Sequence, residues 1–281
     1  MTRHTLITAA DLLPHLADPA WALVDCRYAL AAADWGQQEY AAGHIPGAVY
    51  ADLPRDLAGP VGAGQSGRHP LPAVDALAAR LGAWGIDGRV QVVAYDAAGG
   101  ALAAARLWWL LRRLGHVAVA VLDGGWQGWQ TAGYPVIAGA ESRAARRFTP
   151  QAPAARVADS AAVRAALGAA SVRLLDARAA DRYRGENETI DPVAGHIPTA
   201  QSLPYAGNLD AQGYFLPPEA LRARFAAVLG DVPAEDAIYY CGSGVTAAHN
   251  ILAATHAGLA EGRLYAGSWS EWITDPQRPR A

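Results

Sequence analysis

The sequence contains the same series of short patterns twice, in the same order. The matching pairs, first half then second, are LVDCR at 23–27 and LLDAR at 174–178, GHIPGA at 43–48 and GHIPTA at 195–200, LP at 71–72 and 216–217, VVAYD at 92–96 and AIYYC at 237–241, and GGW at 124–126 and GSW at 267–269. Self-similarity of this kind indicates repeated structural units. The fold of this chain must therefore accommodate two similar halves, each long enough to be a domain.

Within each half, short apolar runs rich in strand-forming residues alternate with helical patterns, such as those at 73–81 and 219–229. This alternation is typical of parallel strands joined by crossover helices. A chain of 281 residues with 52% hydrophobic content can bury two cores. We predict an α/β protein with two tandem domains at 1–140 and 157–281 and a linker at 141–156, each domain a mainly parallel sheet flanked by helices.

The two halves differ most in one loop. The second half has Cys241-Gly242-Ser243-Gly244-Val245-Thr246 where the first half has Asp96. The cysteine follows the strand-like run 237–240 and precedes a helical pattern, which places it at the usual ligand edge of an open parallel sheet. Main-chain N–H groups of a glycine-rich loop and a helix start favour a thiolate over a thiol. This position favours a nucleophile over the other reading, a small buried thiol that only packs.

Composition excludes several other classes of function. The net charge is −3, and the 23 basic residues, all arginine, form no run that predicts nucleic-acid binding. No apolar stretch approaches the length of about 20 residues that spans a bilayer, so we expect a cytoplasmic protein without a membrane partner. Two cysteines make no disulfide framework, and no Cys/His cluster has zinc spacing. We expect neither a cofactor nor a metal.

The duplication, the GHIP patterns and the Cys241 loop together resemble the two-domain rhodanese family of sulfurtransferases, and most of all the 3-mercaptopyruvate sulfurtransferases. The resemblance implies two rhodanese-like domains, the first inactive because Asp96 replaces the cysteine. It also implies a reaction in which Cys241 takes a sulfur atom from 3-mercaptopyruvate as a persulfide and passes it to an acceptor. The acceptor would be a small thiol, thioredoxin or cyanide.

The same resemblance implies roles for residues around the cysteine. Gly242, Gly244, Val245 and Thr246 would contribute to substrate binding in the loop. Ser243 would carry a proton to the pyruvate enolate, although its hydroxyl can also simply cap the following helix.

Two arginines are implied outside the loop of the second half. Arg182 would bind the substrate carboxylate through its planar donor pair. The family commonly has a second arginine nine residues later, but this chain has Asp191 there, so Arg184 is a candidate substitute.

From the first half, the family brings an acid and a histidine to the site, which Asp34 and His44 approximate. His44 has a repeat partner in His196, which favours a structural role in the turn fixed by Pro46 and Pro198.

The sequence also bears on three alternative functions. A thiosulfate:cyanide sulfurtransferase would use the same nucleophile, but such enzymes usually carry basic residues where Gly242 and Ser243 stand. A cysteine phosphatase needs a longer loop that ends in arginine, and position 247 is alanine. A non-catalytic binding module is expected to lack the nucleophile, which is present here.

Overall fold

The structure is a computed structural model that describes residues 2–62, 66–153 and 156–281. The chain forms two compact units, and each takes in a short segment from the other half of the sequence. Unit 1 contains Met1–Gly59, Pro72–Ala155 and Asp210–Phe215, and unit 2 contains Pro60–Leu71, Arg156–Leu209 and Leu216–Ala281. The predicted boundaries treat each domain as one continuous stretch, with 60–71 in the first domain and 210–215 in the second. Ala154 and Ala155, within the predicted linker, lie outside the described residues.

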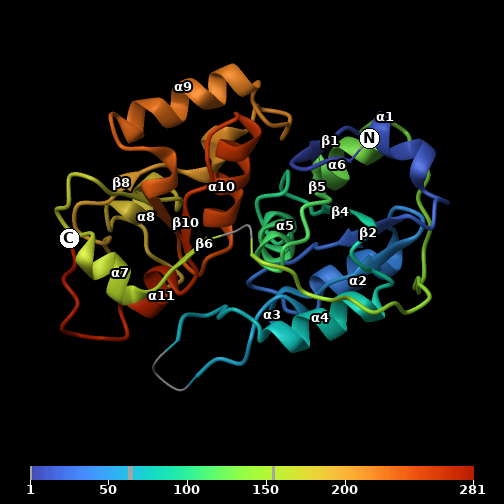
Figure 1. Cartoon of the computed structure of the whole chain (residues 1–281), viewed down its shortest axis with the longest axis horizontal. Helices are drawn as coiled ribbons and strands as arrows, with labels where there is room; N and C mark the ends of the chain where they lie inside the picture. Colours follow the sequence, from blue (N-terminus) through green and yellow to red (C-terminus); the bar gives the residue numbers. More distant parts are fainter. Residues whose placement is uncertain (1, 63–65, 154–155) are drawn as a thin grey trace. The chain divides into compact units, whose positions relative to one another are not determined.

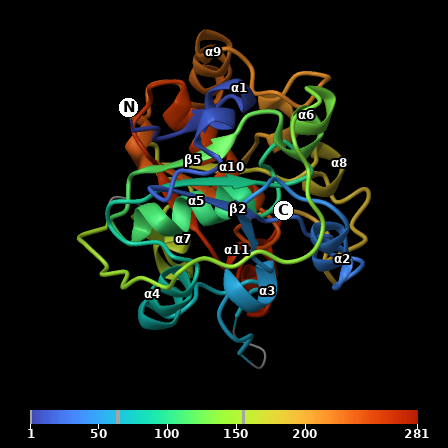
Figure 2. The same ribbon diagram turned by 90° about the vertical axis from the view of Figure 1, so that its right-hand side faces the viewer.

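Unit 1 is built on a five-stranded parallel sheet in the order β1-β5-β4-β2-β3. Its strands are β1 (Leu6–Ile7), β2 (Trp21–Asp25), β3 (Ala48–Tyr50), β4 (Gln91–Tyr95) and β5 (Val119–Leu122). Its helices are α1 (Ala9–Leu12), α2 (Trp35–Ala42), α3 (Leu53–Asp56), α4 (Val74–Ala83), α5 (Ala104–Arg113) and α6 (Gly125–Thr131). Every residue of the central strands β2 and β4 is buried, because helices cover a parallel sheet on both faces (Figures 1 and 2).

Unit 2 has the same topology, with a five-stranded parallel sheet in the order β6-β10-β9-β7-β8. Its strands are β6 (Arg156–Ala158), β7 (Arg173–Asp176), β8 (Gln201–Ser202), β9 (Ala237–Tyr240) and β10 (Arg263–Tyr265). Its helices are α7 (Ser160–Ala165), α8 (Ala180–Tyr183), α9 (Pro218–Leu229), α10 (Thr246–His256) and α11 (Ser268–Trp272). The predicted α/β fold of two similar parallel-sheet domains is confirmed.

The repeated sequence patterns have repeated structural roles. Asp25 and Arg27 form a fully buried ion pair at 2.6 Å, and Arg27 also donates to Gly43 O. Asp176 and Arg178 form the same pair at 2.6 Å, and Arg178 donates to Gly195 O. Each arginine lies over a tryptophan of the repeated Gly-x-Trp pattern, with its guanidinium carbon 4.4 Å from the ring centre in unit 1 and 5.0 Å in unit 2. The Asp-x-Arg motif therefore fixes the start of the GHIP turn in both units.

No helix within the described parts of the chain is both long and apolar enough to cross a bilayer.

Candidate active site

Cys241 lies directly after β9, at the carboxyl end of the central strand of unit 2, and is 2% exposed. Its Sγ accepts a hydrogen bond from the main-chain N–H of Gly244 at 3.1 Å. The loop can curl round the sulfur because Gly244 adopts φ +75°, where its backbone approaches Ala266 too closely for a side chain. Val245 then leads into α10, whose first residue is Thr246. The predicted strand, turn and helix start are confirmed.

A second segment, at residues 268–270, is hydrogen-bonded to the backbone of Cys241 and Gly242. The hydroxyl of Ser268 accepts the N–H of Cys241 at 3.1 Å and donates to Tyr265 O at 2.8 Å. Ser268 has φ +55°, a conformation that costs a residue with a side chain about 1–3 kcal/mol. The N–H groups of Trp269 and Ser270 donate to the carbonyls of Cys241 and Gly242. Hydrogen bonds to the 268–270 segment thus hold the backbone of Cys241 and Gly242 in place.

Ser243 lies two residues from Cys241 and is hydrogen-bonded to a histidine. Its Oγ is 2.8 Å from Nδ1 of His69, and both side chains are buried. His69 belongs to the 60–71 segment, which comes from the first half of the sequence but is part of unit 2. A hydroxyl paired with an imidazole can pass a proton in either direction.

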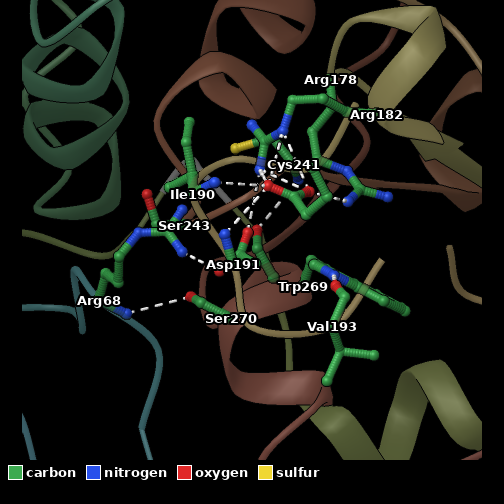
Figure 3. Close-up of polar contacts among 12 residues, drawn as sticks. Arg68, Arg178, Arg182, Ile190, Asp191, Val193, Cys241, Ser243, Trp269 and Ser270 are labelled. Carbon is green, nitrogen blue, oxygen red and sulfur yellow. Dashed lines mark hydrogen bonds and ion pairs between the residues drawn. The ribbon is translucent and has the colours of Figure 1, made fainter. Parts of the chain in front are cut away.

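A group of ion-paired side chains lies beside the loop (Figure 3). Arg182 donates through Nε and Nη2 to both carboxylate oxygens of Glu188, at 2.8–3.1 Å, and through Nη2 to Asp191 at 3.0 Å. Asp191 also forms a short ion pair with Nη1 of Arg68. The carboxylate of Asp191, only 1% exposed, therefore bridges two guanidinium groups.

The two carboxylates of this group respond differently to their surroundings. Burial acts to raise the pKa of Glu188, but the hydrogen bonds from Arg182 and from the N–H groups of Asp191 and Ile190 outweigh it, so the pKa lies below the ordinary value. Burial raises the pKa of Asp191 above its ordinary value in spite of the two arginines. Glu188 is thus the main counter-charge of Arg182.

The structure brings Cys241, Ser243, Gly242 and Arg182 together in unit 2. Arg184 is half-exposed and pairs with the exposed Glu186, so it lies outside the group of ion-paired side chains around Asp191.

The two residues predicted from the first half belong to unit 1. Asp34 precedes α2 and is exposed, and its side chain makes no cap hydrogen bond to that helix. His44 is fully buried, bonds Tyr40 O through Nδ1 at 2.7 Å and stacks on the Tyr40 ring, as His196 does with Tyr183. These contacts support the structural reading of His44.

Three residues around the site were missed in the sequence: Arg68, His69 and Glu188. The first two could have been found by comparing the two repeats. They immediately precede Pro70 and the repeated Leu-Pro pattern, and the corresponding residues of the second half are Gly213 and Tyr214. Such a difference between repeats is the same kind of signal that singled out Cys241. No group of three His, Cys, Asp or Glu side chains suited to a metal ion occurs among residues 2–62, 66–153 and 156–281.

Comparison with known proteins defines the class. The model of the rhodanese-like domain matches this chain twice, at residues 8–132 and 159–275. The chain therefore belongs to the rhodanese-like domain family, with two such domains in tandem. Its relatives are named as sulfurtransferases, and the chain is a sulfurtransferase enzyme that takes sulfur from a donor and passes it to a thiol acceptor.

Particular relatives cover nearly the whole chain. It is 50% identical to a protein of Pseudomonas aeruginosa named "Probable 3-mercaptopyruvate sulfurtransferase", over 100% of this chain and 99% of that protein. It is 33% identical to thiosulfate sulfurtransferase of Bos taurus, over 84% of this chain and 80% of the relative. The crystal structure of SseA from Escherichia coli, described with the 3-mercaptopyruvate sulfotransferases, superposes with a TM-score of 0.81 at 32% identity, covering 96% of this chain and 100% of that one.

Proposed function

We propose that this enzyme takes sulfur from 3-mercaptopyruvate, holds it as a persulfide on Cys241 and passes it to a small thiol, thioredoxin or cyanide. The observation that carries the proposal is the hydrogen bond between Ser243 and His69, two residues from the nucleophile. A proton carrier is needed when a carbon–sulfur bond breaks. It is not needed when the sulfur donor is thiosulfate.

The proposed sulfur transfer has two steps. The thiolate of Cys241 attacks the sulfur of 3-mercaptopyruvate, a sulfur–sulfur bond forms, and the carbon–sulfur bond breaks with its electron pair going to the pyruvate enolate. The proton of the substrate thiol leaves the new persulfide, and the enolate gains a proton at carbon 3, which gives pyruvate. We assign the movement of this proton to Ser243 and His69, which are hydrogen-bonded to each other. The acceptor thiolate then attacks the outer sulfur and releases Cys241.

The alternative donor is thiosulfate, in which the sulfur–sulfur bond breaks and sulfite leaves as a stable anion without taking a proton. One observation favours thiosulfate: Arg68 supplies a positive charge beside Gly242, so the loop does have a basic neighbour. The similarity to a thiosulfate sulfurtransferase points the same way. The uncharged Gly242 and Ser243 and the hydrogen bond to His69 favour 3-mercaptopyruvate.

The test compares Ser243→Ala with Ser171→Ala, which alters an exposed serine of the same unit. We expect Ser243→Ala to lower kcat/KM with 3-mercaptopyruvate about a hundredfold, since general acid catalysis contributes that order of rate, and to leave thiosulfate turnover nearly unchanged. Intact-mass measurement should show a gain of about 32 Da, one sulfur atom, on the wild type after exposure to 3-mercaptopyruvate.

Two results would count against the proposal. Equal losses with both donors would remove Ser243 from the proton path. A persulfide that forms with thiosulfate but not with 3-mercaptopyruvate would establish the alternative donor.

The remaining features of the proposal rest on composition and on the family. A net charge of −3 gives no basic field for nucleic acid, and we propose a cytoplasmic enzyme without a membrane partner. The domain limits of 1–140 and 157–281, and a substrate-side role for Asp34, stay predictions.

A further inference from the structure

Residues 141–153, which belong to the predicted linker, are packed on unit 1. The main-chain N–H of Arg146 donates to Gly82 O at 2.9 Å, and a side chain on Gly82 would collide with the backbone of Arg146. Arg143 lies against Gly85, which has φ +71° and leaves only 2.9 Å between Cβ of Arg143 and the position of a Cβ at 85. Glycine at these two positions therefore lets the segment approach the unit closely and gives both arginines fixed places.

The guanidinium groups of Arg143 and Arg146, the arginine pair, converge on one carbonyl oxygen. Nη2 of Arg146 donates to Pro19 O at 2.9 Å, and Nη2 of Arg143 donates to the same oxygen at 3.3 Å. Because Pro19 precedes β2, the pair lies at the amino ends of the parallel strands, whereas Asp96 follows the carboxyl end of β4. One acceptor thus holds two like charges close together, at the edge of the sheet opposite to the Asp96 loop.

The charges of the arginine pair are only partly compensated. Arg146 has Asp87 at 3.5 Å, and Asp87 is shared with Arg89 at 3.9 Å. Arg143 has no carboxylate within ion-pair distance among residues 2–62, 66–153 and 156–281. Burial, and then the charge of Arg146, lower the pKa of Arg143 below its ordinary value. One positive charge at this edge is therefore left without a counter-charge.

A hollow of about 290 Å³ opens beside the arginine pair. The hydroxyl of Ser142, which lines it, has no hydrogen-bond partner within the described part of the chain. The carboxylate of Asp18 is engaged elsewhere, by His15 at 3.7 Å and by a main-chain N–H at 2.9 Å. A single uncompensated charge with a neighbouring hydroxyl suits a monoanion. The other lining residues are Leu16, Ala17, Pro19 and Ala144.

We propose that the arginine pair and Ser142 form a second anion site, in unit 1, which binds the carboxylate of a small organic acid. A carboxylate between two guanidinium groups receives a charge-assisted hydrogen bond from each of them. It also supplies the counter-charge that Arg143 lacks. The site goes beyond the proposed sulfur transfer, since its residues belong to unit 1 and Cys241 belongs to unit 2.

The experiment uses phenylglyoxal, which reacts with guanidinium groups, on the whole enzyme, with acetate as the probe anion. Peptide mass mapping gives the modification rate at Arg143 and at Arg147, an exposed arginine of the same segment that does not line the hollow. Acetate should slow modification of Arg143 at least about threefold relative to chloride at equal ionic strength, since bound anion occupies its donors. The rate at Arg147 should stay the same.

Three variants locate the effect. Arg146→Gln should remove the protection of Arg143, Arg146→Lys should keep part of it because the charge remains, and the matched control Arg147→Gln should keep all of it. Equal modification of Arg143 in acetate and in chloride would overturn the site, as would protection that survives in Arg146→Gln. Stronger protection by inorganic phosphate than by acetate would overturn the carboxylate assignment and indicate a site for a dianion.

Discussion

The Asp96 loop and the Cys241 loop occupy the same place in two sheets of the same strand order, but they use their main-chain donors differently. Asp96 is fully buried, and its carboxylate accepts four N–H groups, from Ala98, Gly100, Leu102 and Ala104, at 2.9–3.1 Å. Among the described residues, Sγ of Cys241 accepts one, from Gly244. A carboxylate closes the first loop on itself, whereas the second loop holds a thiol with a single main-chain donor among the described residues.

A second difference lies in the segments that precede the repeated Leu-Pro pattern. In unit 2, the 60–71 segment brings His69 to Ser243. In unit 1, the 210–215 segment places the Tyr214 ring where a side chain on Gly124 or Gly128 would collide with it. One segment supplies a titratable group and the other supplies packing. The two repeats therefore differ around this loop by more than a single residue.

The largest expected effect comes from moving the nucleophile. Cys241→Ser should abolish persulfide formation and lower sulfur transfer by at least about four orders of magnitude, since it removes the covalent step. The double variant Asp96→Cys/Cys241→Ser should stay inactive, because unit 1 has Tyr214 where unit 2 has His69. Intact-mass analysis after donor exposure measures both. A persulfide on residue 96 with turnover of 3-mercaptopyruvate would show that the loop alone is sufficient.

The fold was predictable because it depends on local and repeated signals. Strand and helix periodicity indicated the two parallel sheets, and the repeat served as an internal control that singled out Cys241. The 60–71 segment was not predicted to join unit 2, because a surface loop has no periodicity that records where it packs. Its side chains Arg68 and His69 were missed for the same reason.

The ion-pair group was predicted only in part for a physical reason. Arg182 was expected near the substrate, but Asp191 was read as a missing arginine, since a sequence does not show that a carboxylate recruits a guanidinium 123 positions away. Glu188, at 3% exposure of its side chain, looks in sequence like any acidic loop residue. Long-range charge pairing depends on tertiary placement and leaves no local pattern.

The second prediction concerns stability and compares the same position in the two repeats. Asp96→Ala leaves four N–H groups without their acceptor, two of them buried and two partly buried, and at about 1 kcal/mol for each we expect a loss of about 4 kcal/mol of unfolding free energy in unit 1. Cys241→Ala removes one weak acceptor and should cost about 1 kcal/mol. Urea unfolding, with hydrogen exchange of the N–H groups at 98–104 as the local probe, checks the difference. Equal losses for the two variants would contradict the distinction drawn between the loops.

The smallest expected effect tests the counter-charges of the repeated arginines. Arg178 has Glu188 at 3.4 Å with a 3% exposed side chain, whereas Arg27 has Glu39 at 4.0 Å with a 45% exposed side chain. Glu188→Gln should cost about 2 kcal/mol of unfolding free energy because it breaks a buried charge network, while Glu39→Gln should cost less than about 0.5 kcal/mol.

The pH dependence of this difference has a definite sign. Burial acts to raise the pKa of Glu188, but its hydrogen bonds from Arg182, Asp191 and Ile190 outweigh burial and lower the pKa below the ordinary 4.5, so the folded state keeps the carboxylate charged where the unfolded chain protonates it. The stability gained from Glu188 is therefore complete above pH 4.5 and is lost as the pH falls through the lower folded-state pKa. The gap in unfolding free energy between wild type and Glu188→Gln should be constant between about pH 5.5 and about pH 7 and should narrow below 4.5. A gap that widens on acidification would mean that Glu188 is protonated in the folded enzyme. In that case its bonds to Arg182 could not be ionic, and Asp191 would be left as the carboxylate that holds both Arg68 and Arg182.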